Sequence, residues 1–291
     1  MLKIIIKSPE GFIWLSKFPI LRAFFSISAE SLFKIKDDEL YTEVVTRMRY
    51  GDVTGKATEV GRFDDLNEIL ELLPDKVIQI HDVGCSLGVT SLDLANALKE
   101  RNKSFCLTIS DRFLLLLIYG KGIKYLFDST GSLRQIYLGR ILCDQHLSKI
   151  FFVSRILYKI LSAKQENDLM AGEAVTVRLV NPSVQKEINS GQMEIKSYNV
   201  FEKDNHKNYD FIRCMNLLNR SYFSDEEILV GLNNLADALG DKGYLQVGRT
   251  DYKGVNKVSV FKKESETLVL VKQHNGGAEI EDIIKQLCLE Q

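Results

Sequence analysis

The sequence predicts an α/β fold built on a doubly wound, mostly parallel sheet of seven strands. A short β-branched run over residues 77–83 ends in a glycine turn, and a helical stretch follows over residues 86–99. A second apolar run, over residues 105–109, is closed by Ser110-Asp111. Strand, glycine turn, helix and strand in succession are typical of doubly wound sheets, so ligand-binding residues are expected beyond the carboxyl ends of the strands.

The remaining strands are expected in the second half of the chain. Apolar runs predict a third, fourth and fifth strand and a final pair, over residues 193–200, 209–218, 243–248, 258–262 and 267–272. A helix is expected over residues 224–239, because Ser224 and Glu227 have the spacing of a capping box and Gly240 marks its end. A terminal helix is expected over residues 279–289.

Two segments fall outside this alternation. Residues 1–75 are expected to be a helical N-terminal extension, with one helix over residues 64–73 that stops before Pro74. Residues 112–191 are apolar and basic and too long for one crossover helix, so they are expected to be a helical cap or insertion. Residues 76–291 would then form the main domain around that insertion.

Composition excludes several classes of protein. Lysine and arginine (38) balance aspartate and glutamate (39), so the chain lacks the basic excess of a general nucleic-acid binder. The five cysteines are odd in number, widely spaced and without a CxxC pair. This argues against a disulfide framework or a zinc site, and it favours a reducing compartment such as the cytoplasm.

The N-terminus carries an apolar stretch that leaves two interpretations open. Residues 12–27 are rich in Phe, Trp, Leu and Ile but are interrupted by Lys17, Pro19 and Arg22. The stretch falls short of the ~20 apolar residues that cross a bilayer. It either packs on the main domain or lies on a membrane surface, so peripheral membrane association stays open.

The glycine turn Gly84-Cys85-Ser86-Leu87-Gly88 has three interpretations. As a dinucleotide fingerprint it fails, because the third glycine is missing and Ser86 takes the place of the second. As a G-x-S-x-G elbow it would make Ser86 the nucleophile of a serine hydrolase, with His274 and Asp251 as partners. That fold needs strands and an oxyanion loop before the elbow, which this sequence does not supply.

The third interpretation is a resemblance. Asp82, Gly84 and Gly88, with Ser86 replacing a middle glycine, resemble the first motif of class I S-adenosylmethionine-dependent methyltransferases. Glycines let the backbone approach the cofactor, and amides at a helix start face it. The resemblance implies a Rossmann-like fold and places Asp111 where an acid ending the second strand binds the ribose hydroxyls. An acid at the Asp82 position would receive the amino group or order the turn.

Within this class the chain resembles the chemotaxis-receptor methyltransferase branch, mainly over residues 77–111 and 193–250. That branch has a Gly-Cys-Ser-x-Gly turn and a later strand similar to residues 210–218. Asn199-Val200 falls where the branch places a cofactor-contacting pair, and Thr58 and Arg62 have the spacing of its upstream contacting segment. Met215 departs from the branch, which has arginine there. The resemblance is therefore carried over for cofactor binding and not for glutamate methylation.

The sequence thus predicts methyl transfer from S-adenosyl-L-methionine, without a metal. The expected cofactor-binding residues are Asp82, Gly84, Cys85, Ser86, Gly88, Asp111, Asn199, Val200 and Asn216. The acceptor is expected to be a hydroxyl or carboxyl of an amphiphilic, lipid-linked or glycan molecule. No catalytic residue is assigned, although His146 in the inserted segment is a candidate general base. The alternatives are the Ser86 hydrolase and a catalytically silent cofactor-binding module.

Overall fold

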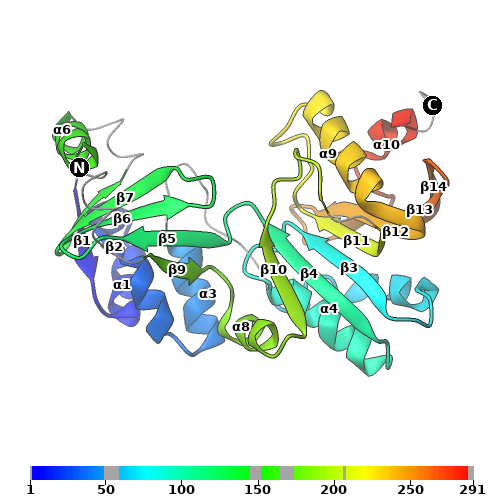
Figure 1. Cartoon of the computed structure of the whole chain (residues 1–291), viewed down its shortest axis with the longest axis horizontal. Coiled ribbons are helices and arrows are strands. Elements are labelled where there is room, and N and C mark those ends of the chain that lie inside the picture. Colours follow the sequence, from blue (N-terminus) through cyan, green and yellow to red (C-terminus); the bar gives the residue numbers. More distant parts are fainter. Residues whose placement is uncertain (1, 49–58, 145–151, 164–173, 206–207, 288–291) are drawn as a thin grey trace. The chain divides into compact units, whose positions relative to one another are not determined.

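The computed structural model describes residues 2–48, 59–144, 152–163, 174–205 and 208–287. The chain divides into two compact units (Figure 1). Unit 1 consists of Met1–Thr58 and Phe113–Ser183, and unit 2 of Glu59–Arg112 and Val184–Gln291. The extension and the insertion that the sequence sets apart thus lie largely in one unit.

Unit 2 contains the predicted seven-stranded sheet. Its strand order is β10-β4-β3-β11-β12-β13-β14. The first five strands pair in parallel, and β13 pairs antiparallel with both β12 and β14, so the sheet is mixed rather than wholly parallel. The bounds are β3 (Ile78–Val83), β4 (Phe105–Asp111), β10 (Met193–Ser197), β11 (Tyr209–Met215), β12 (Leu239–Thr250), β13 (Asn256–Glu264) and β14 (Thr267–His274).

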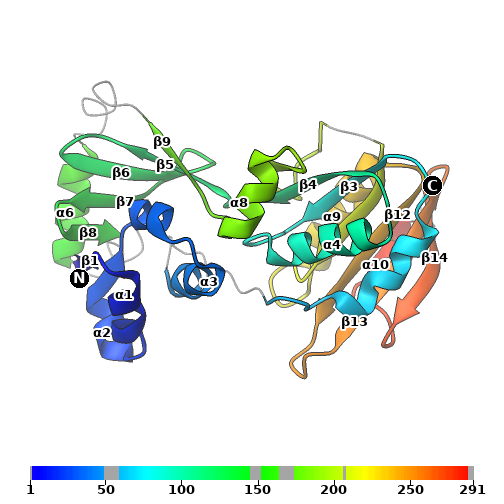
Figure 2. The same ribbon diagram turned by 90° about the horizontal axis from the view of Figure 1, so that it is seen from below.

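Helices cover both faces of this sheet, as the doubly wound prediction requires (Figures 1 and 2). Helix α4 (Val89–Glu100) and the 3₁₀ helix η2 (Asp64–Leu72) lie on one face, and α9 (Asp225–Ala238) and α10 (Glu281–Leu287) on the other. A further helix, α8 (Pro182–Asn189), lies beside α4. The capping box predicted at Ser224 is confirmed, with both of its hydrogen bonds present.

The strand order fixes where a ligand would bind in unit 2. From β3 the chain passes to β4 and β10 on one side, and it later adds β11 and β12 on the other. The order therefore reverses between β3 and β11, and the loops that leave these two strands diverge. Doubly wound sheets bind their ligands in the crevice that opens at the carboxyl ends of such a pair.

Unit 1 corrects the sequence prediction. Residues 112–191 do not form a helical cap: they contribute five strands, and their described helices are α6 (Phe152–Ser162) and α8. The sheet order is β2-β1-β8-β7-β6-β5-β9. The bounds are β1 (Lys3–Ile6), β2 (Phe25–Ile27), β5 (Leu115–Tyr119), β6 (Ile123–Asp128), β7 (Leu133–Leu138), β8 (Ile141–Asp144) and β9 (Val175–Arg178).

Glycines explain why this segment forms hairpins instead of helices. Gly120, Gly131 and Gly139 all have positive φ and lie between consecutive antiparallel strands. Such glycines end a helix but suit a tight turn. In β5, which precedes Gly120, burial alternates residue by residue, which is the period of a strand and not of a helix.

The N-terminal extension is helical only in part. It forms α1 (Pro9–Ser16), α2 (Pro19–Phe24), the 3₁₀ helix η1 (Ala29–Lys34) and α3 (Asp38–Arg47). It also supplies β1, which pairs with β8 and with β2. The extension therefore completes the sheet of the insertion, and the core of unit 1 is built from two distant stretches of chain.

Candidate functional site

The glycine turn leaves β3 in a left-handed conformation. Gly84, Ser86 and Gly88 have φ values of 78°, 57° and 77°. Left-handed backbone is costly for residues with a Cβ, so the two glycines fit their positions and Ser86 is the exception. The amides of Gly84 and Cys85 both donate to the Ser110 carbonyl, at 2.8 and 3.0 Å. The turn is thereby held against the end of β4.

Both glycines are also required by close packing. A Cβ on Gly88 would lie 2.9 Å from the Val184 side chain, and a Cβ on Gly84 would lie 3.1 Å from Leu217. Gly88 is the N-cap of α4 and provides no side-chain cap. The first amides of α4 are therefore not satisfied by a capping side chain, which is the arrangement that binds anionic or polar ligand groups at a helix start.

Asp111 lies beside this turn, as the sequence predicts. It is the last residue of β4, and its Oδ2 accepts a hydrogen bond from the Ser86 amide at 3.0 Å. Its carbonyl accepts from the Tyr198 amide at 3.3 Å, which brings the loop after β10 to the same edge. The structure thus places Asp111 between the glycine turn and the segment that contains Asn199.

Asp82 has a different environment from the one predicted for a cofactor anchor. Its carboxylate forms a buried, bidentate ion pair with Arg213 of β11, with Nε–Oδ1 and Nη2–Oδ2 distances of 2.9 and 2.7 Å. Ser91 Oγ donates to Oδ2 at 2.5 Å, and Arg213 also donates to the Thr90 carbonyl. These contacts favour a role of Asp82 in ordering the turn and α4 over a role in receiving the amino group of the cofactor.

Arg213 is a residue of this site that is absent from the set predicted by sequence. The signal was available, because a charged residue inside an otherwise apolar strand is almost never buried without a partner. Its partner was not readable, since Asp82 lies 131 positions earlier in the chain.

Asn216 directly follows β11 and joins a polar network at the sheet edge. Its φ is 59°, and its Oδ1 accepts from the Thr250 amide at 2.7 Å. Thr250 Oγ1 in turn accepts a hydrogen bond from Arg62 Nε at 3.1 Å. Arg62 forms no ion pair within the described part of the chain, so a guanidinium lies at this edge without a carboxylate partner there.

The segment that carries Arg62 lies close to the start of α4. The Gly61 amide donates to Asp93 of α4 at 2.9 Å, and Phe63 packs with Met215 at the end of β11. Burial raises the pKa of the Asp93 carboxyl, with smaller opposing contributions from the Gly61 hydrogen bond and Arg213. Arg62 is therefore beside the crevice, whereas Thr58 lies outside the described residues.

Asn199 and Val200 follow β10 and form a turn of their own. Asn199 Nδ2 donates to Glu202 at 3.0 Å, and its Oδ1 accepts from the Phe201 amide at 3.4 Å. Val200 is buried, and its carbonyl accepts from Asn234 of α9 at 3.0 Å. Asn199 and Val200 are thus held at the carboxyl end of β10, on the same edge of the sheet as the glycine turn and Asp111.

The contacts expected for a hydrolase at Ser86 are not formed among the described residues. His274 Nε2 contacts Asp65 at 3.0 Å, and Asp251 caps its own loop by accepting the Lys253 and Val255 amides. The predicted trio of Ser86, His274 and Asp251 is therefore not assembled. His146 lies outside the described residues.

A different Ser–His–Asp arrangement lies inside the sheet. His81 Nε2 contacts Ser110 Oγ at 2.7 Å, and His81 Nδ1 lies 3.4 Å from Asp204 Oδ2. Lys196 neutralises Asp204 with contacts of 2.7 and 2.6 Å. Ser110 and His81 are both 0% exposed, so no substrate reaches this hydroxyl. The arrangement fixes the packing of β3, β4 and β10 and does not qualify as a nucleophilic site.

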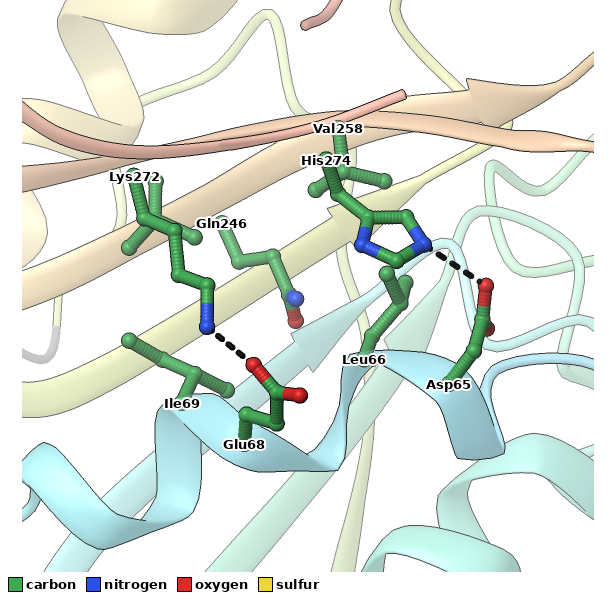
Figure 3. Close-up of a pocket in the computed structure, with 9 residues that line it drawn as sticks. Asp65, Leu66, Glu68, Ile69, Gln246, Val258, Lys272 and His274 are labelled. Atoms are coloured by element: carbon green, nitrogen blue, oxygen red, sulfur yellow. Dashed lines mark hydrogen bonds and ion pairs between the residues drawn. The ribbon is translucent and has the colours of Figure 1, made fainter. Parts of the chain in front are cut away.

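A small pocket lies apart from the glycine turn, between η2 and the strands β12 to β14 (Figure 3). Ion pairs join Asp65 to His274 and Glu68 to Lys272, and Gln246 enters between them. Its volume of about 20 Å³ is enough for one water molecule but not for a cofactor. The described residues also contain no cluster of three or more metal-ligating side chains.

No family model matches the chain, and no curated protein matches it. Similar solved structures include the CMeT domain of the citrinin polyketide synthase, at 12% identity and a TM-score of 0.39 over 82% of this chain. A TehB-like methyltransferase from Corynebacterium glutamicum is 11% identical over 79% of the chain, with a TM-score of 0.34. An S-adenosylmethionine-dependent methyltransferase from Clostridium acetobutylicum is 11% identical over 80% of it, with a TM-score of 0.36.

The chain spans 46% of the citrinin synthase domain chain, 73% of the Corynebacterium protein and 80% of the Clostridium protein. These are distant similarities to methyltransferases, and the resemblance to the chemotaxis-receptor branch stays a prediction. The function is therefore inferred from the residues of the site.

Proposed function

We propose that unit 2 binds S-adenosylmethionine in the crevice between β3 and β11 and that the protein transfers its methyl group to an acceptor. The observation that carries this proposal is the placement of the left-handed glycine turn at the point where the strand order reverses, with Asp111 bonded to it. Doubly wound sheets hold nucleoside ligands at this point.

The residues present fit the chemical groups of this cofactor. The turn of residues 84–88 leads into the start of α4, where no side chain caps the first amides, so these amides suit polar groups of the cofactor. The Asp111 carboxylate suits the two ribose hydroxyls, since an ionised carboxylate has several acceptor sites and this one lies beside the glycine turn. Arg62 suits the carboxylate end of the amino-acid moiety, because it forms no ion pair within the described part of the chain.

When bound, the sulfonium supplies an activated methyl group, so the protein mainly aligns the reactants. The Asp82–Arg213 pair holds the turn and β11 in a fixed relation, and the Asn216–Thr250 contacts fix the end of β11 against β12. For the acceptor we propose a hydroxyl or carboxyl of an amphiphilic molecule, lipid-linked or glycan. This is supported by the exposed apolar side chains of unit 1 and by its exposed lysines, Lys7 and Lys17 among them.

Calorimetry with S-adenosylhomocysteine on the full chain tests cofactor binding. We expect micromolar affinity, and Asp111→Asn should weaken it by about 10- to 100-fold, the value of one charge-assisted hydrogen bond. Asparagine keeps an acceptor for the Ser86 amide, so the turn should persist in this variant. Arg62→Ala should weaken binding by a similar factor.

Asp241→Ala is the matched control, because Asp241 is an exposed carboxylate near the start of β12, at the opposite edge of the same sheet. Its affinity should equal that of the unmodified protein. No binding by the unmodified protein, or an unchanged affinity in Asp111→Asn, would contradict the proposed site. Labelling of Ser86 by a fluorophosphonate would favour the hydrolase instead.

Binding without turnover would identify a catalytically silent module. To separate the two, the protein is incubated with radiolabelled S-adenosylmethionine and lipid or glycan extracts. Transfer of label to an extracted molecule, lost in Asp111→Asn, is the result expected for an enzyme.

A further inference from the structure

Unit 1 exposes large apolar side chains on two consecutive short helices. Trp14 is 59% exposed on α1, and Ile20 is 75% exposed on α2. Phe18, which lies between Trp14 and Ile20 in sequence, is 47% exposed, and Phe24 at the end of α2 is 46% exposed. The rings of Trp14 and Phe18 are in edge contact, with their centroids 5.4 Å apart. We refer to Trp14, Phe18, Ile20 and Phe24 as the α1–α2 face. Clustered exposure of this kind marks an interaction surface, unlike scattered single residues.

The exposure does not arise from a loosely formed helix. Ser8 caps α1 by accepting the Gly11 amide at 3.1 Å, and Pro9 occupies its first turn. The opposite side of α1 is anchored by Phe12 and Ile13, which are buried. By contrast, α2 buries none of its residues. The structure therefore presents an apolar helix that makes little contribution to the core of its own unit.

Basic side chains accompany this face. Residues 1–36 contain six lysines and arginines and two glutamates, a net charge of +4, whereas the whole chain has a net charge of −1. Lys17 joins the two helices, and Lys7 precedes α1, and both are exposed. One of the two glutamates, Glu10, is hydrogen-bonded to Ser8. Lys7 and Lys17 are thus exposed at the two ends of α1, next in sequence to the apolar side chains.

We propose that the α1–α2 face docks unit 1 on the surface of an anionic lipid bilayer. Aromatic and aliphatic side chains with lysines at their edge suit the headgroup region, where a tryptophan indole is both apolar and hydrogen-bonding. The lysines are attracted to the negative surface potential. No helix among the described residues is long and apolar enough to cross a membrane. This inference is independent of the methyltransferase proposal.

Trp14 provides a built-in probe of this contact, because it is the only tryptophan of the chain. Its emission is followed while the full protein is titrated with phosphatidylcholine vesicles that contain or lack phosphatidylglycerol. We expect a blue shift with the anionic vesicles that high salt reverses. Brominated lipids in the same vesicles should quench the emission, which would show that the indole reaches the acyl chains.

Two variants test the apolar and the electrostatic contributions separately. The double variant Ile20→Ser, Phe24→Ser should lower partitioning by about tenfold or more, because it removes apolar area that the bilayer would bury. Folding should be preserved, since α2 buries no residue. Lys7→Glu with Lys17→Glu should lower partitioning into anionic vesicles by about fivefold or more per residue. Neither readout depends on the cofactor or on methyl transfer.

Tyr252→Ser is the matched control, because Tyr252 is a 91% exposed aromatic residue in unit 2. It should leave partitioning unchanged. An absent shift with anionic vesicles, or an equal shift with neutral ones, would overturn the proposal. So would a blue shift that grows with protein concentration in the absence of vesicles and is lost in the α2 double variant. That result would assign the face to a second copy of this chain.

Discussion

An arginine–aspartate pair with a buried carboxylate lies in each unit, and the two pairs differ in how they are built. In unit 2, Arg213 and Asp82 join β11 to β3 across 131 positions of sequence. In unit 1, Arg134 and Asp128 join neighbouring strands of one hairpin across six positions, with an Nε–Oδ2 distance of 2.6 Å. Similar chemistry thus serves a long-range contact in one unit and a local contact in the other.

The difference shows where each unit needs to be fixed. The Arg213–Asp82 pair connects the two strands between which the strand order reverses, directly beside the glycine turn. The Arg134–Asp128 pair only reinforces a turn in which Asp128 also accepts from Thr130 and from the Ser132 amide. The first pair therefore couples the stability of unit 2 to the geometry of its proposed site, whereas the second stabilises a hairpin.

Asp82→Ala should lower the free energy of unfolding more than any other substitution proposed here, and the loss should be confined to unit 2. It leaves the Arg213 guanidinium buried without its carboxylate, which typically costs about 3–5 kcal/mol of unfolding free energy. Urea unfolding measures the loss, and hydrogen exchange of β3 and β11 peptides assigns it to unit 2. Peptides from β6 and β7 should exchange as in the unmodified protein.

The control for this change is Asp225→Ala. Asp225 also pairs with an arginine, Arg220, at 2.8 Å, but both side chains are exposed. The cost should stay within about 0.5 kcal/mol, because exposed ion pairs are screened by solvent. An equal loss in both variants would mean that burial of the Asp82 pair is not what matters.

Asp128→Asn should have a smaller effect that depends on pH. Burial raises the pKa of Asp128, but hydrogen bonds from Thr130, Arg134 and Ser132 outweigh it and hold the pKa below its usual value. The carboxylate therefore stabilises the fold above the unfolded-state pKa of about 3.9, and this contribution is lost as the pH falls through the folded-state pKa. We expect a difference of about 1.5–3 kcal/mol at neutral pH.

The measurement is urea unfolding of both proteins from neutral pH to well below 3.8, the usual pKa of aspartate, so that the series passes through the lowered pKa of Asp128. The difference between them should shrink as the pH falls through the lowered pKa of Asp128. A difference that stays constant over this range would mean that charge on Asp128 contributes nothing. Hydrogen exchange should then confine the loss to unit 1, the reverse of the Asp82→Ala result.

The two units also differ in how far their sequences predict them. In unit 2 the strands, the capping box at Ser224 and the final antiparallel pair could be predicted, because local signals and tertiary packing agree there. In unit 1 a run such as residues 123–128 fits either a helix or a strand by composition. Its assignment depends on a sheet completed by β1, which comes from the other end of the unit's sequence.

The same limit applies to the site. The positions of the glycine turn, Asp111 and Asn216 follow from strand ends, which the sequence indicates directly. Which side chains they contact does not follow, because the partners of Asp82 and Arg62 come from strands far away in the chain. The sequence therefore predicts where the glycine turn lies, but it does not predict which side chains form hydrogen bonds or ion pairs across the sheet.

The smallest expected effect compares two helix caps, one in each unit. Ser224 begins α9 with a capping box, and Ser8 begins α1 with a single bond to the Gly11 amide. Ser224→Ala should cost about 1 kcal/mol and Ser8→Ala about 0.5 kcal/mol, both measured by urea unfolding. The larger cost is expected for α9 because its apolar face is buried in the core of unit 2, so fraying there exposes more surface. Equal costs would show that the cap bonds alone set the effect, and that packing of the helix behind them adds nothing.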